Sequence, residues 1–180
     1  MSSPAGPDRS VRPAQGGDAR AIARLQAEAW RSLMGQAALD AQGITEEALA
    51  AQWEATLASL RPAGSALLVA LHGNTVVGFA LAGPDEAGAA SADCAESGEG
   101  AVAATQVYEL AVEKNFRRSG HASRLLAAVA DVTSGQLRVW VGVDDEERQR
   151  FYTSAGFEPS GAVRVLGDGP TQHMWWAERD

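Results

Sequence analysis

The feature that most constrains the fold is a basic turn that joins an apolar strand directly to an amphipathic helix. Residues 107–112 are rich in strand-forming side chains, and the turn at 117–122 reads Arg-Arg-Ser-Gly-His-Ala. From 123 to 132 the apolar residues recur at helical spacing. The first N–H groups of a helix lack intrahelical partners and carry partial positive charge. The sequence therefore predicts a site for a phosphate-like anion at this helix N-terminus.

A second strand is predicted after this helix, at 136–143, and Gly135 is the expected end of the helix between them. Two strands joined through one helix form a right-handed crossover and lie parallel in the sheet. The chain should therefore contain a parallel strand pair with the anion site at its opening turn.

The remaining segments predict one α/β domain with a mixed, mostly antiparallel sheet and helices on its faces. Before the parallel pair we expect an edge strand at 10–14, helices that begin after Asp18 and Thr45, and strands 66–71 and 75–81 around a Gly73-Asn74 turn. After the pair we expect a helix that is capped by Asp144 or Asp145 and ends at Gly156, and then a hairpin from 161–166 to 171–178.

Two segments are expected to lie outside this core. Residues 1–9 read as a disordered tail, and residues 10–180 as the single domain. The stretch 82–104 is dominated by Ala, Gly, Ser, Asp and Glu without periodicity, which predicts a flexible acidic insertion between two antiparallel strands. Cys94 falls inside it, with no local group to activate a thiol.

Charge and cysteine content exclude several classes of protein. The formal net charge is −8 and the isoelectric point about 4.9, which argues against a nucleic-acid binder. A single cysteine rules out an internal disulfide framework. No apolar run has the length of a membrane span, and no Cys/His/Asp spacing suggests a metal site. A cytoplasmic protein with neither a membrane nor a nucleic-acid partner is the expectation, and a homodimer stays open.

The basic turn resembles the pyrophosphate loop of the GNAT superfamily of acyl-CoA-dependent N-acyltransferases, [Gln/Arg]-x-x-Gly-x-[Gly/Ala]. Arg117, Gly120 and Ala122 stand at its defined positions. The order of elements from Val11 to Ala177 and the run from Asp145 through Tyr152 to Gly156-Phe157 are also similar to that superfamily. The resemblance implies an N-acetyltransferase that moves an acetyl group from acetyl-CoA to an amine.

The resemblance also implies a set of site residues. The co-substrate would be held by backbone groups of the strand and by the loop, at Leu110, Ala111, Val112, Arg117, Arg118, Ser119, Gly120, His121 and Ala122, together with Asp145 and Tyr152. His121 itself occupies a variable loop position and is expected to face solvent.

Two residues are candidates for proton transfer. Glu109, whose side chain should point opposite to Leu110, is the candidate base for the amine, and a solvated or ion-paired carboxylate is the equal alternative. Tyr152 is the candidate acid for the departing sulfur, and packing against Phe157 across the glycine is the alternative.

The reaction and the acceptor are less constrained than the site. No cysteine lies near the proposed centre, which favours direct attack in a ternary complex over a covalent acyl-enzyme. The acceptor can be a small-molecule amine or a peptide amine, and Trp53, Trp175 and Trp176 could wall its pocket. A non-catalytic acyl-CoA-binding regulatory module is the main alternative, and an interaction protein that uses the acidic insertion is a weaker one.

Overall fold

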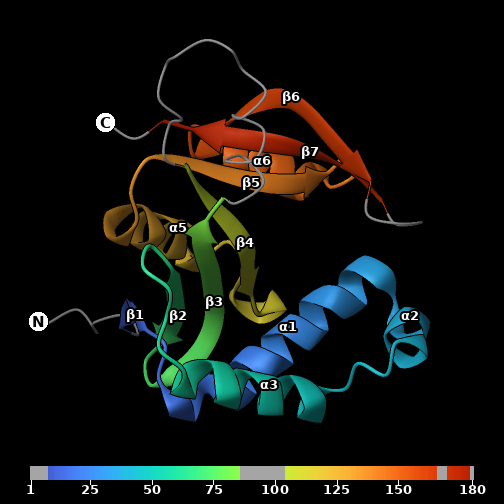
Figure 1. Cartoon of the computed structure of the whole chain (residues 1–180), viewed down its shortest axis with the longest axis vertical. Helices are drawn as coiled ribbons and strands as arrows, with labels where there is room; N and C mark the ends of the chain where they lie inside the picture. Colours follow the sequence, from blue (N-terminus) through green and yellow to red (C-terminus); the bar gives the residue numbers. More distant parts are fainter. Residues whose placement is uncertain (1–7, 86–103, 166–169, 179–180) are drawn as a thin grey trace, which may run out of the picture.

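The computed structural model describes residues 8–85, 104–165 and 170–178. Over these residues a seven-stranded sheet runs through the molecule in the order β1-β2-β3-β4-β5-β7-β6 (Figure 1). Neighbouring strands are antiparallel apart from β4 and β5, which are parallel. The predicted fold class is therefore confirmed. The strands are β1 Arg9–Pro13, β2 Ala66–His72, β3 Thr75–Pro84, β4 Ala104–Val112, β5 Gln136–Gly142, β6 Glu158–Val165 and β7 Thr171–Ala177.

Helices cover the two faces of the sheet and create two apolar cores. On one face, α1 and α3 pack Ile22 and Trp53 against Phe79 of β3. On the other, α5 packs Leu125 against the strands in a cluster that also holds Tyr152 of α6. The helical segments are η1 Gly16–Asp18, α1 Ala19–Met34, α2 Gln36–Ala41, α3 Glu46–Ala58, η2 Lys114–Phe116, α5 His121–Val132 and α6 Glu146–Ser154.

The parallel pair separates soon after it begins. β4 and β5 are paired only from Ala104–Gln136 to Val107–Val139, and beyond that point β4 keeps β3 as its partner. The backbone groups on the β5 side of β4 therefore leave the ladder after Val107. We call this opening between the two strands the split.

A bulge in β4 lies where the split begins. In the ladder with β3, Leu81 is opposite Glu109 whereas Ala82 is opposite Val107, so Tyr108 is the extra residue. Side chains alternate along a strand, and one extra residue reverses which face the next side chains meet. Val107 packs in the α5-side core, while Glu109 contacts α1 on the opposite face.

Several sequence predictions about turns and caps are confirmed. Thr45 caps α3 by accepting a hydrogen bond from the Ala48 amide at 3.1 Å, and β2 and β3 turn between His72 and Thr75. Gly156 has φ +85°, and the Phe157 amide donates to the Tyr152 carbonyl at 3.0 Å. That closure of α6 places the rings of Tyr152 and Phe157 5.1 Å apart.

Other predictions need correction. The Asp18 side chain does not cap α1; it accepts hydrogen bonds from Arg12 and from the Gln15 amide. Arg9 already belongs to β1, and α2 was not expected at all.

The predicted bounds of the insertion, 82 and 104, are wrong at both ends. Ala82 to Pro84 belong to β3, and Ala104 begins β4. Asp85, also inside the predicted insertion, has a fully buried side chain that forms an ion pair with Arg138 of β5 at 2.8 Å. The rest of that prediction, at 86–103 with Cys94, and most of the predicted tail, at 1–7, fall outside the described residues.

Candidate active site

The basic turn has backbone geometry suited to an anion. Gly120 is the N-cap of α5 with φ +83°, and Arg118 also has positive φ, +58°. Gly120 offers no side chain to the first amides of α5, so these donors stay available to a ligand. A Cβ at Gly120 would lie 2.8 Å from Nη1 of Arg124, and glycine keeps that approach open.

Neighbouring side chains hold this turn in shape. Nη1 of Arg9 donates to the Ser119 carbonyl at 2.9 Å, and the Ser119 hydroxyl donates to the Phe116 carbonyl. Arg117 is exposed, donates from Nε to the Val112 carbonyl at 3.4 Å, and lies 3.8 Å from the carboxylate of Glu147. The turn is therefore tied to β1, to β4 and to α6.

The prediction that His121 faces solvent is wrong. Its side chain is 1% exposed, and its ring lies 5.7 Å from that of His72 and 6.2 Å from that of Phe116. Within the described residues neither of its ring nitrogens has a hydrogen-bond partner. Burial lowers the pKa of His121, and the nearby His72, Arg9 and Arg124 lower it further. The neutral ring is therefore part of the structure beneath the turn.

Glu109 is held by a series of two hydrogen bonds that begins at Trp53 of α3. The Trp53 indole donates to Oε1 of Gln26 at 2.8 Å, and Nε2 of Gln26 donates to Oε2 of Glu109 at 2.7 Å. The other carboxylate oxygen, Oε1, is buried and has no partner of ordinary hydrogen-bond geometry among the described residues, although the Trp30 indole lies near enough to lower the pKa of the group. Burial raises the pKa of Glu109, against the lowering effect of Gln26, Trp30 and Arg148. A carboxyl group with a raised pKa and a free oxygen has the properties of a general base.

Tyr152 lies on the other side of β4. Its side chain is 1% exposed, and its ring contacts those of Phe151 and Phe157 at 5.0 and 5.1 Å. Burial raises the pKa of its hydroxyl to about 12. The packing alternative considered for this residue is therefore observed, and within the described residues no hydrogen bond engages the hydroxyl.

Arg148, which sequence reasoning missed, extends from α6 into the split. Its Nη2 donates to the Leu110 carbonyl at 3.0 Å, and its Nε lies 3.8 Å from Asp145. Asp145 in turn caps α6 by accepting from the Arg148 amide at 3.0 Å. The charge of Arg148 lowers the pKa of both Glu109 and Tyr152, so it lies electrostatically close to each. No feature of the sequence marks this arginine, because its reach depends on where the strands part.

Gln26 was missed as well, although the sequence carries a signal for it. It stands four residues after Ile22, on the buried stripe of α1, and a glutamine there must find polar partners. The predicted strand residues Ala111 and Val112 pair with Phe79 and Gly78 of β3 on their other edge.

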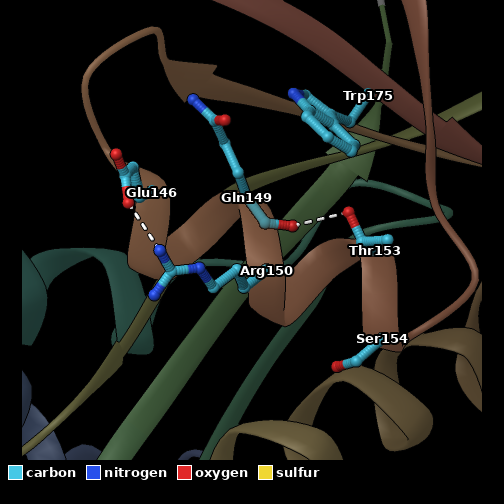
Figure 2. A pocket seen from close by; sticks show the side chains of 6 residues that line it. All are labelled: Glu146, Gln149, Arg150, Thr153, Ser154 and Trp175. Carbon is cyan, nitrogen blue, oxygen red and sulfur yellow. Dashed lines mark hydrogen bonds and ion pairs between the residues drawn. The ribbon is translucent and has the colours of Figure 1, made fainter.

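Two hollows adjoin α6. The larger, of about 560 Å³, lies on the outer side of the helix and includes Trp175 of β7 among its lining (Figure 2). The smaller, of about 370 Å³, runs between α5 and the end of α6, from Ser123 to Ala155 and Phe157. Neither lining includes a residue of the turn, Glu109 or Tyr152, but the smaller hollow begins at Ser123, immediately after the turn.

The described residues contain neither a cluster of metal-binding side chains nor a membrane-spanning helix. Across residues 8–85, 104–165 and 170–178, no three His, Cys, Asp or Glu side chains gather in a way that could hold a metal ion. Among the helices in those ranges, none has the length and apolar character to cross a membrane.

Comparison with known proteins identifies a family domain and a shared fold. The family model for the acetyltransferase (GNAT) domain matches residues 63–159. A GNAT-family acetyltransferase from Bacillus cereus is 17% identical, with a TM-score of 0.65 over 96% of this chain and 99% of that chain. At these identities the solved structures show the fold alone. No curated protein sequence matches the chain.

Two further solved structures carry the co-substrate or part of it. The paia N-acetyltransferase from Thermoplasma acidophilum, in complex with coenzyme A, is 12% identical, with a TM-score of 0.65 over 96% of this chain and 99% of that chain. The protein yncA from Salmonella typhimurium, with its cofactor acetyl-CoA, is 15% identical, with a TM-score of 0.67 over 96% and 95%.

Proposed function

The chain belongs to the GNAT acetyltransferase family, and from this we propose that it transfers an acetyl group from acetyl-CoA to an amine. The observation that carries the proposal is the split, which has the free oxygen of Glu109 on one side of β4 and the Tyr152 hydroxyl on the other. The acceptor is an amine of a small molecule or of a peptide.

The turn at 117–122 is the proposed pyrophosphate site. Backbone amides of Ser119, Gly120, His121 and Ala122 would donate to phosphate oxygens, while Arg117 and Arg118 would supply charge. The positive φ values and the uncapped start of α5 support this assignment. The smaller hollow, which begins at Ser123, is the proposed place of the nucleotide's adenosine part.

The pantetheine arm is proposed to lie in the split. Its amides need partners, and the backbone groups of Leu110 and Val112 lie outside strand pairing on the β5 side of β4, whereas Ala111 pairs with β3. The carbonyls of Leu110 and Val112 accept from Arg148 and Arg117, so these arginines border the same place. Asp145 supports this region by fixing the start of α6.

Glu109 is the proposed base. An amine must lose its proton to attack a thioester carbonyl, and a base with a raised pKa takes that proton more readily than an ordinary carboxylate. Gln26 fixes one oxygen of Glu109 and leaves Oε1 for the amine or for an intervening water. With Glu109 as the base, the amine can attack the thioester of acetyl-CoA directly while both are bound in a ternary complex.

Tyr152 is the proposed acid for the departing thiolate. Its high pKa keeps the hydroxyl protonated at neutral pH, so it can donate to the sulfur. Its burial against Phe157 holds the hydroxyl in one place without using it in another hydrogen bond in the described structure.

Binding and turnover test the proposal separately. Gly120→Asp and Gly120→Asn form a matched pair, because both residues tolerate positive φ and only Asp adds a charge facing pyrophosphate. We expect calorimetry to show CoA affinity at least ~10-fold weaker in the Asp variant than in the Asn variant, the loss of about one charge-assisted hydrogen bond. Equal affinities would contradict the assignment of the turn at 117–122 as the pyrophosphate site.

A screen of amines for thiol release from acetyl-CoA tests the activity itself. Release with at least one amine, dependent on Glu109, is the expected result. Tight CoA binding without release from any amine would instead favour the non-catalytic binding module.

A further inference from the structure

Arg148 brings a positive charge to the place where the two reactants are proposed to meet. Its guanidinium donates to the carbonyl of Leu110, in the part of β4 that β5 has left. The same charge acts on Glu109 on one face of the sheet and on Tyr152 on the other. No other residue acts on both candidate groups in this way among those the structure describes.

The positive charge of Arg148 is only weakly neutralised. The nearest carboxylate is Asp145, 3.8 Å from Nε and therefore beyond hydrogen-bond distance. Oδ1 of Asp145 caps α6, and Oδ2 is the oxygen that faces Arg148. The side chain of Arg148 is 43% exposed, so its guanidinium is not sealed inside the protein.

A guanidinium whose ion pair with Asp145 is long is an unusual neighbour for an amine reaction. It repels the ammonium form of the acceptor, and contact with one backbone carbonyl uses only a small part of its hydrogen-bonding capacity. The planar fork of donors matches a carboxylate in two-point geometry, which a lysine does not offer.

We propose that Arg148 forms a carboxylate-binding subsite in the split, so that one of the two reactants carries a carboxylate close to its reacting group. The inference rests on the proposed function. The carboxylate can come from the acyl group, as in a dicarboxylic acyl-CoA, or from the acceptor, as in an amine with an adjacent carboxylate. Both sources present the same chemistry to the guanidinium.

The first arm of the test examines the acyl group and needs no acceptor. Calorimetry compares acetyl-CoA with succinyl-CoA on the wild-type protein and on Arg148→Gln. If the acyl group carries the carboxylate, the wild type should bind succinyl-CoA at least ~10-fold more tightly, the effect of a charge-assisted contact. The Gln variant should bind both thioesters equally, with acetyl-CoA affinity within a few-fold of the wild type.

The second arm examines the acceptor. Thiol release from acetyl-CoA is followed with an α-amino acid and with its carboxamide, which lacks the carboxylate and whose amine is also less basic. The preference is therefore compared at a pH where both amines are largely neutral, and as the change in the ratio of their kcat/KM values between wild type and Arg148→Gln. If the acceptor carries the carboxylate, the wild type should favour the amino acid by at least ~10-fold in kcat/KM, and Arg148→Gln should lose that preference.

Arg150→Gln is the matched control for both arms. Arg150 lies two residues away, on the outer side of α6, where it pairs with Glu146 at 2.6 Å (Figure 2). This variant removes the same charge from the same helix and should keep the wild-type preference. If Arg148→Gln does not fold, Arg148→Lys tests the loss of the two-point geometry, and we expect a reduced preference.

The outcomes separate the inference from the proposed function. An Arg148-dependent preference in either arm supports the subsite and identifies the source of the carboxylate. A wild-type protein that binds CoA thioesters but shows no preference in either arm overturns the subsite alone, as does a preference that survives in Arg148→Gln. Failure to bind any CoA thioester overturns the proposed function and the subsite with it.

Discussion

At the scale of single residues, the packing role of the Tyr152 ring can be tested separately from the proposed acid role of its hydroxyl. The ring fills the core beside Phe157, so Tyr152→Phe keeps the contact and removes only the oxygen. We expect kcat to fall roughly 10- to 10³-fold, because general acid catalysis is typically worth about 10²–10⁴. CoA affinity and melting temperature should hardly change, since the proposed hydrogen bond to the departing sulfur acts in the transition state.

Single-turnover kinetics with an accepted amine is the measurement for Tyr152→Phe, because slow product release can hide a change in the chemical step. A variant with the wild-type single-turnover rate would show that solvent protonates the thiolate.

His121 gives a second prediction at this scale. The pKa of His121 in the folded protein lies below the ordinary 6.5. At a pH between these two pKa values, His121 is protonated in the unfolded chain and neutral in the folded one. Stability is therefore full above about pH 6.5 and is lost as the pH falls towards the folded pKa. His121→Leu fills the same buried space without a titrating group, and its melting temperature should fall less between pH 7.5 and 5.5 than that of the wild type.

Replacing the exposed His173 of β7 by Leu is the matched control for His121. It should leave the wild-type pH dependence of the melting temperature in place. An identical pH dependence in wild type and His121→Leu would show that protonation of this ring does not oppose folding.

At the scale of elements, Gln26 connects two helices to the strand that enters the basic turn. Gln26→Leu leaves the Trp53 indole and one oxygen of Glu109 without partners. Each such loss costs about 1–3 kcal/mol, so the free energy of unfolding should fall by at least about 2 kcal/mol. The pKa of Glu109 should rise further, because Gln26 now lowers it, and the acid limb of the pH–rate profile should move to higher pH.

The measurements for Gln26→Leu are urea unfolding and the pH dependence of kcat/KM. Gln36→Leu on the exposed surface of α2 is the control, because its hydrogen bonds to Arg31 and Asp40 are solvent-accessible. If Gln26→Leu proved as stable as this control, the hydrogen bonds that link Trp53, Gln26 and Glu109 would not contribute to the stability of the fold.

Most elements could be predicted from the sequence because their signals are local. The Gly73-Asn74 turn, the Thr45 cap and the glycine that ends α6 each depend on a few adjacent residues. The bulge at Tyr108 has no such signal, since it is defined by its pairing with β3. Consequently the sequence predicts that Glu109 points opposite to Leu110 but not which helices it meets.

The candidate site was predictable to the same extent. Gly120 and Tyr152 stand in short motifs with fixed spacing, so local sequence finds them. The burial of His121 depends on His72 and Phe116, and the reach of Arg148 depends on the split; both are set by distant segments.

At the scale of the whole molecule, the ion pair between Asp85 and Arg138 joins the two halves of the sheet. β4 and β5 are paired over only a few residues, and this contact adds a link from the end of β3 to β5. Breaking a buried pair on one side leaves an uncompensated charge and costs about 3–5 kcal/mol. Because Arg138 keeps some solvent contact, we expect Asp85→Asn to lower the free energy of unfolding by about 3 kcal/mol.

Thermal unfolding measures this effect, and for a chain of this size about 3 kcal/mol corresponds to a decrease of ~6–12 °C in Tm. Glu146→Gln, which breaks the exposed pair with Arg150, is the control and should change Tm very little. Similar Tm values for the two variants would show that the Asp85 pair adds no more than a surface contact.

The placement of Glu109 and Tyr152 on opposite faces of the sheet has a kinetic consequence. If the amine approaches from the α1 side and the thioester from the α5 side, neither reactant blocks the path of the other. Either one can then enter first, and either product can leave while the other stays bound. Initial-rate and product-inhibition patterns should accordingly be those of random addition, and a compulsory order would have to arise from movement of the chain between the two entrances.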